Sequence, residues 1–145
     1  MFNFRLEPLI TIRNNVLQEC QAELAKAYEA RQILENDMKK LDQQIAEGMQ
    51  NARDIMQTGK IINVEYLIGF RRQEMFLRAN QDELMEKIKL VDEEIEARRS
   101  AVAVANKELK IVEKLKEQRF EKYLAEQNQT EMKMMDEIAG NRRRG

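Results

Sequence analysis

The stretch Gln57-Thr58-Gly59-Lys60-Ile61-Ile62-Asn63 separates two long heptad patterns, and it decides how the rest of the chain is expected to fold. On each side of it, mostly apolar or small residues recur with alternating steps of three and four. The first series is Leu17, Cys20, Leu24, Ala27, Arg31, Leu34, Met38, Leu41, Ile45, Gly48, Ala52 and Ile55. The second is Leu67, Phe70, Glu74, Leu77, Gln81, Leu84, Ile88, Val91, Ile95, Arg98, Val102, Ala105, Leu109 and Val112. This spacing is typical of two helices that supercoil left-handedly with their apolar faces together.

The separating stretch predicts a reversal of the chain. Glycine reaches positive φ without a Cβ penalty, so the first helix is expected to end near Gly59, and Asn63 is expected to cap the second. With Ile55 facing Leu67, the two series pair in antiparallel order. The expected pairs include Ala52 with Phe70, Ile45 with Leu77, Met38 with Leu84, Leu34 with Ile88, Ala27 with Ile95, Cys20 with Val102, and Ile10 with Val112. Among polar members, Arg31 faces Val91, Gly48 faces Glu74 and Leu24 faces Arg98. A slip by one heptad keeps most of this pattern but moves the turn away from Gly59.

The fold class predicted is therefore all-α: a long antiparallel two-helix coiled-coil hairpin with a protruding C-terminal helical tail. The expected bounds are a single coiled-coil domain over 1–145, with helix 1 at about 8–57, a turn at about 58–63 and helix 2 at about 64–139. Asn3 falls opposite Arg119, so residues beyond about Phe120 are expected to have no partner within the chain. A long helix that dimerises with another copy has the same heptad signature and is the structural alternative.

Composition excludes several classes of function. The 145 residues hold 25 Lys and Arg against 26 Asp and Glu, and a mixed, nearly neutral charge argues against nucleic acid as a partner. There is no histidine and only one cysteine, Cys20, so no disulfide, metal site or cofactor is expected. Carboxylates on a solvated helix pair lack a concave pocket to perturb their pKa values, so neither an enzyme nor a small-molecule substrate is expected. No apolar run of about 18 residues occurs, which favours a cytoplasmic protein.

Two surfaces are candidates for binding partners. Near the turn, the segment 60–70 is crowded with apolar residues, and the candidates at this tip are Tyr66, Phe70 and Phe76, because exposed apolar clusters bind partners. The alternative is that the turn packs on itself. At the opposite end, the candidates are Phe2, Phe4, Arg119, Tyr123, Met135 and Asp136. The alternatives there are that Phe2 and Phe4 pack on the second helix and that the tail is a frayed terminus.

Three non-enzymatic classes fit these residues equally well: an adaptor of a secretion machine, a stalk-like subunit of a rotary ATPase, and a generic coiled-coil spacer or chaperone. Composition and period do not separate them.

Motifs at both ends resemble the FliJ family of flagellar export proteins. The opening Phe2-Asn3-Phe4-Arg5-Leu6-Glu7-Pro8-Leu9-Ile10 is similar to that family's "F-x-F-R-L-E-x-L-L" start, from which Pro8 departs. The segment 107–123, with Glu113-Lys114-Leu115-Lys116-Glu117 and Tyr123, resembles its late charged helix. The ending Glu131-Met132-Lys133-Met134-Met135-Asp136-Glu137-Ile138-Ala139 resembles its "K-x-x-D-E-I/F-A" close.

The resemblance implies a component of the flagellar type III export apparatus, built as an antiparallel coiled coil. It implies binding to the hexameric export ATPase and to the membrane export gate, assistance to export chaperones, and a place at the cytoplasmic face of the membrane apparatus. With these partners, the end that carries Phe2 is expected to contact the ATPase, and the tip that carries Tyr66 is expected to contact the gate.

Overall fold

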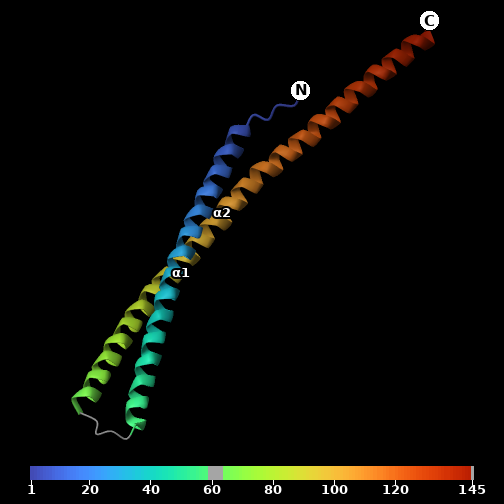
Figure 1. Ribbon diagram of the computed structural model, residues 1–145. Coiled ribbons are helices and arrows are strands. Elements are labelled where there is room, and N and C mark those ends of the chain that lie inside the picture. The colour runs from blue at the N-terminus through green and yellow to red at the C-terminus, as the bar shows by residue number, and fades with distance from the viewer. Residues whose placement is uncertain (59–63, 145) are drawn as a thin grey trace. The chain divides into compact units, whose positions relative to one another are not determined.

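The structure, a computed structural model, describes residues 1–58 and 64–144, and for Arg144 the backbone alone. The described residues form two α-helices, α1 (Glu7–Gln57) and α2 (Val64–Arg144), shown in Figure 1. At the end of α1 the Thr58 hydroxyl donates a hydrogen bond of 2.8 Å to the carbonyl of Ile55. The expected helix stop at Gly59 and cap at Asn63 lie outside the described residues.

The first turn of α1 accommodates the single proline of the chain. The Glu7 N–H donates to the Phe4 carbonyl at 3.1 Å, and Pro8 follows as the second helical residue. Proline costs little there because a first-turn N–H has no intrahelical acceptor. The helix consequently begins one residue earlier than the sequence pattern indicated.

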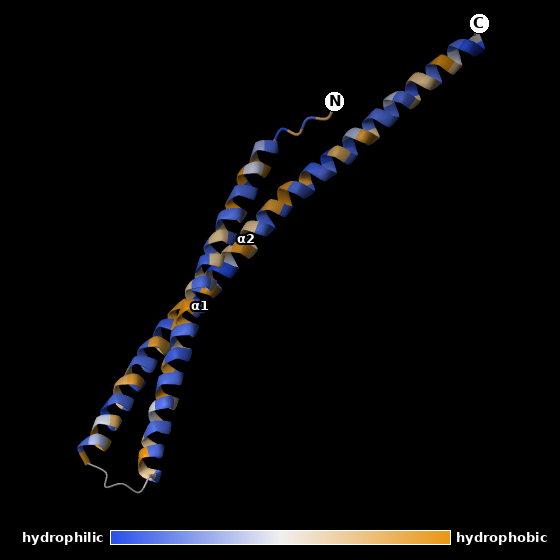
Figure 2. Ribbon diagram, viewed as in Figure 1, coloured by the Kyte–Doolittle hydropathy of each residue, from blue (hydrophilic) through white to orange (hydrophobic). Residues whose placement is uncertain are grey.

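Both heptad series lie on the less exposed faces of the helices. Every residue of the two series is buried or half-buried, including the polar members Arg31, Gln81 and Arg98. Figure 2 shows hydrophobic positions recurring among hydrophilic ones along α1 and α2. The prediction of an all-α fold with two long helices packed on each other is confirmed.

Two compact units make up the chain, and the unit of Ala22–Ser100 contains the end of α1 and the start of α2. Its buried side chains are Ala27, Ile45, Leu77 and Ile95. Arg31 Nε donates to Asp92 Oδ1 at 2.6 Å, and Arg98 forms an ion pair with Glu23.

In each contact the observed partner is the sequence neighbour of the expected one. Arg31 contacts Asp92 where Val91 was expected, and Arg98 contacts Glu23 where Leu24 was expected. The helices are therefore antiparallel in this unit, and a slip by a whole heptad is incompatible with these contacts.

The other unit joins Met1–Gln21 to Ala101–Gly145. Its buried side chains are Phe4, Ala105, Leu109 and Val112. Arg13 bridges to Glu108 at 2.6 Å, and Lys116 bridges to Glu7 at 2.7 Å. The order of these partners shows that the helices are antiparallel in this unit as well.

The C-terminal part of α2 has no buried position over a long stretch. Every residue from 124 to 139 is exposed, whereas Tyr123 is half-buried. The sequence analysis predicted that this unpartnered stretch begins after about Phe120. It starts at Leu124 instead, because Phe2 packs against both Phe120 and Tyr123.

Candidate partner-binding surfaces

An aromatic cluster joins the N-terminus to α2. The Phe2 ring lies 5.1 Å from the Phe120 ring in an edge-to-face arrangement and 5.5 Å from the Tyr123 ring, measured between centroids. Such spacings are those of favourable aromatic pairs. The Arg119 guanidinium carbon lies 6.0 Å from the centroid of Phe4, which is 5% exposed. Phe2 and Phe4 therefore pack against the second helix.

This arrangement divides the residues expected at the ATPase end into two groups. Phe2, Phe4, Arg119 and Tyr123 come together, and the Tyr123 hydroxyl also accepts a hydrogen bond of 2.9 Å from Gln127. Met135 lies twelve residues further along α2, about 18 Å away by the helical rise. The structure does not bring it to the aromatic cluster.

The second group is an exposed apolar surface, here called the tail surface. Its members are Met132, Met134, Met135 and Ile138, which are 67%, 60%, 72% and 55% exposed. Asp136 is also exposed on this segment. Methionine side chains are flexible and polarisable, so they adapt to varied partner surfaces. A cluster of this composition, with acidic and basic neighbours in the sequence, fits a binding surface.

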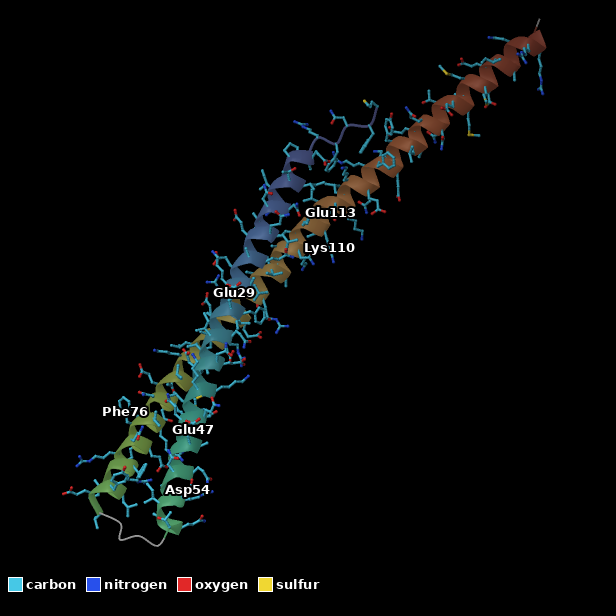
Figure 3. All side chains as sticks on the ribbon, in the orientation of Figure 1. Glu29, Glu47, Asp54, Phe76, Lys110 and Glu113 are labelled. Carbon is cyan, nitrogen blue, oxygen red and sulfur yellow. The ribbon has the colours of Figure 1, made fainter. Side chains whose placement is uncertain are left out.

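Near the start of α2, the three aromatic candidates do not form one cluster. Tyr66 and Phe70 pack edge to face at 5.4 Å between ring centroids. Phe76 is 66% exposed and projects away from α1, as Figure 3 shows. Six residues along a helix place it about a third of a turn from Phe70. Tyr66 and Phe70 thus form one candidate contact, and Phe76 forms another.

An open groove of ≈ 340 Å³ lies beside Phe70, between the two helices. Its lining consists of Gln44, Ile45, Gly48, Met49, Ala52, Arg53, Met56, Leu67, Phe70, Arg71, Gln73, Glu74 and Leu77. The sequence analysis expected no concave pocket that excludes water, and this groove is open to solvent. The small residues Gly48 and Ala52 on α1 leave the space open, and a Cβ at Gly48 would meet nothing within 4 Å.

Charges at the rim of this groove are held by ion pairs. Glu74 accepts from Arg78 Nε at 2.9 Å and from Arg71 Nη1 at 3.3 Å. The hydrogen bond from Arg78, aided by the positive charge of Arg71, holds the pKa of Glu74 below its ordinary value. Glu74, which lines this groove together with Gly48, is therefore a carboxylate whose charge is compensated by its own helix.

The family described as "Flagellar FliJ protein" matches residues 1–144. The chain belongs to this family. FliJ proteins are non-catalytic components of flagellar protein export, and this assigns the chain to the flagellar export apparatus. No curated protein and no solved structure matches it.

The features of this FliJ chain that sequence reasoning missed are the groove and the role of Phe120. The pairing of Gly48 with Glu74 and of Ala52 with Phe70 was a signal for the groove, because two small residues one turn apart leave a gap between helices. Phe120 was recognised only as part of an apolar face. Its contact with Phe2 depends on the path of the residues before α1, which carry no periodic pattern.

In residues 1–58 and 64–144, no group of three or more His, Cys, Asp or Glu side chains is placed to hold a metal ion. Neither described helix contains an apolar stretch of the length that crossing a bilayer requires.

Proposed function

We propose that the chain binds the hexameric flagellar export ATPase through the tail surface and the aromatic cluster around Phe2. The observation that supports this most strongly is the exposed stretch 124–139, where α2 carries large apolar side chains and no part of α1 covers them. Apolar side chains that are exposed in the free protein supply affinity when a partner buries them.

Charged residues lie among these methionines and determine how a partner is oriented on the tail surface. Glu131 and Asp136 flank Met132 and Met135, and Lys133 lies between them. Charges at the rim of an interface mainly set the orientation and the rate of encounter. In this proposal the chain promotes assembly or activity of the ATPase and hydrolyses nothing itself.

The surface near the start of α2 is proposed to bind the membrane export gate. Tyr66 is 59% exposed, Phe70 lines the groove, and Phe76 is exposed on a neighbouring face of α2. An apolar groove with charged residues at its rim suits an amphipathic segment of a partner protein. Contact with the gate places the protein at the cytoplasmic face of the membrane apparatus, where it also assists delivery by export chaperones.

Removal of residues from Glu131 onward tests the ATPase contact. The truncated protein should remain helical, because residues 124–139 contribute nothing to the buried core. It should lose its stimulation of ATP hydrolysis by the export ATPase. Full stimulation by the truncated protein would place the contact within the paired part of the helices and would favour the spacer alternative for the tail.

A double substitution gives a sharper version of that test. Met132→Ser together with Met135→Ser removes apolar surface without shortening the helix. Met85→Ser is the matched control, because Met85 is 62% exposed on the same helix outside the tail surface. Binding to the ATPase, measured by titration, should weaken for the double variant and stay unchanged for the control.

The gate contact is tested with alanine at Tyr66 and at Phe76, separately. Each variant should weaken capture of the gate protein without loss of helicity, while Met75→Ala, at a residue 59% exposed next to Phe76, serves as the control. Unimpaired capture by both variants would move the gate contact elsewhere.

A further inference from the structure

A second heptad series runs along the part of α2 that belongs to the unit of Met1–Gln21 and Ala101–Gly145. Its members, all of them exposed, are Val104, Lys107, Ile111, Lys114 and Gln118. The first four each follow a member of the packed series by two residues, which is about 200° around a helix. The series therefore forms a surface of α2 opposite the packed face, here called the lysine surface.

Exposed apolar side chains and a shallow groove lie along the lysine surface. Ile111 is 59% exposed and Val104 is 56% exposed. The open groove beside them, of ≈ 360 Å³, is lined by Ala103, Asn106, Lys107, Lys110, Ile111 and Lys114. Figure 3 shows Lys110 on the side of α2 away from α1. Apolar side chains that are exposed together in this way are typical of a surface that binds a partner.

The positive charge of this surface is not neutralised within the chain. In the part of the chain that the structure describes, Lys116 binds Glu7 at 2.7 Å, but no ion pair includes any of the three lysines that line the groove. Glu108, the acidic neighbour of Lys107 in the sequence, is bound instead by Arg13 of α1 at 2.6 Å. The charge that complements this surface is therefore negative.

The order of charges along α2 favours a helix over a lipid bilayer as the acidic partner. Glu117 and Glu121 follow Lys114 within two turns and end the run of lysines. A bilayer of anionic lipids presents an even layer of negative charge, so it would be repelled by these carboxylates as well as attracted by the lysines, which lie within a Debye length of about 8 Å. A helix carries its carboxylates at separate positions and can place them at the lysines alone.

We propose that the lysine surface binds an amphipathic helix of a partner protein, on which acidic and apolar residues alternate with steps of three and four. The carboxylates of the partner lie opposite Lys107 and Lys114, and its apolar residues cover Ile111 and Val104. Because the steps of the series are those of a coiled-coil seam, the partner helix packs lengthwise along α2.

This contact is short and separate from the two proposed above. From Val104 to Gln118 it spans about 21 Å by the helical rise, which suits a transient interaction rather than a permanent one. It contains none of the residues proposed for the ATPase or for the gate, and it leaves the packing of α2 against α1 in this unit unchanged.

A designed peptide of about three heptads tests the contact, with leucine and glutamate at the two alternating seam positions. Two versions, in which the leucine and glutamate positions are exchanged, allow for either direction of the partner helix. Titration with the full chain, followed by fluorescence anisotropy, should show binding of at least one version that weakens with added salt. If neither version binds at low salt, the proposal is wrong.

Charge reversal of two lysines tests whether the contact is specific. Lys107→Glu with Lys114→Glu should raise the dissociation constant of the glutamate peptide about tenfold or more. The matched control is Lys39→Glu with Lys40→Glu, an equal charge change at exposed residues of α1, which should leave that constant unchanged. Equal weakening by the two variants would mean that the peptide responds to net charge alone, and this would overturn the proposal.

The reversed protein should regain binding toward a peptide that carries lysine in place of glutamate, because opposite charges then face each other again. Circular dichroism should show the helicity of the wild type for the reversed protein. A reversed protein that is helical but does not bind the lysine peptide would contradict the assignment of Lys107 and Lys114 to the contact.

The apolar part of the contact is tested by Ile111→Ser, which should weaken binding of the glutamate peptide. Ile12→Ser is the matched control, because Ile12 is 57% exposed on α1 in the same unit. The control should bind the peptide as the wild type does. Unchanged binding by Ile111→Ser would remove Ile111 from the contact and leave no apolar seam for a helix to cover.

Vesicles distinguish a partner helix from a bilayer. The wild-type chain and the Lys107→Glu, Lys114→Glu variant should sediment equally with phosphatidylcholine vesicles that contain about a third phosphatidylserine. A loss of sedimentation that is confined to the variant would assign the lysine surface to the bilayer and would overturn the proposal of a partner helix.

Discussion

Replacing Ile95 with alanine is expected to destabilise the helix pair by about 2–3 kcal/mol. Ile95 is 6% exposed, and its expected neighbour on α1, Ala27, is 7% exposed. The substitution removes three carbon groups, each worth about 0.8 kcal/mol when buried, which gives about 2.4 kcal/mol. Little is added for a cavity, because a helix pair one layer deep lets water or neighbouring side chains enter the space.

Urea unfolding followed by circular dichroism measures this loss as a lower midpoint at an unchanged slope. Ile33→Ala is the matched control, since Ile33 is 61% exposed and removes the same three carbon groups. Its effect should remain within about 0.5 kcal/mol. Equal losses for the two variants would refute the assignment of the packed face, because an exposed and a buried isoleucine would then contribute alike.

Three further outcomes follow from the same contacts. Gly48→Ala should raise stability by about 0.5–1 kcal/mol in the same urea assay, because the position is helical and has room for a Cβ. Acidification should lower the urea midpoint. Arg98 holds the pKa of Glu23 below its ordinary 4.5, and Arg78 does so for Glu74, so their stabilising effect is present above pH 4.5 and is lost as the pH falls through the depressed values. Glu23→Gln with Glu74→Gln should reduce that dependence. Phe4→Ala should cost about 3 kcal/mol in the urea assay, whereas Phe76→Ala should have little effect there, because only Phe4 is buried.

The packed face was predictable because it is a local, periodic property of the sequence. A residue such as Leu34 or Ile88 is assigned by its spacing from its neighbours alone, and each assigned position is buried or half-buried. The antiparallel pairing was also predictable, since a break between two such patterns leaves only a few alignments that keep apolar residues together. Arg31 and Arg98 show that the pairing was right to within one residue.

The binding surfaces were less predictable, for two physical reasons. The position of Phe2 depends on the path of the chain before Glu7, where no repeating pattern constrains the backbone. The groove beside Gly48 exists because the side chains there are too small to fill the space between the helices. A periodic pattern shows which residues face the partner helix, but it does not show how completely their side chains fill that space. The ring contact of Tyr66 with Phe70 likewise separated Tyr66 from Phe76, although the sequence grouped all three aromatic residues.

The division between packed and exposed positions explains why binding functions can be altered here without loss of the fold. Two long helices in a single layer stabilise each other through one series of side chains on each helix, and the remaining positions contribute little to the free energy of unfolding. Met135 in the tail surface and Phe76 near the start of α2 both belong to those remaining positions. Substitutions at these places should therefore separate the proposed contacts, since ATPase stimulation and capture of the gate protein should change independently while helicity remains that of the wild type.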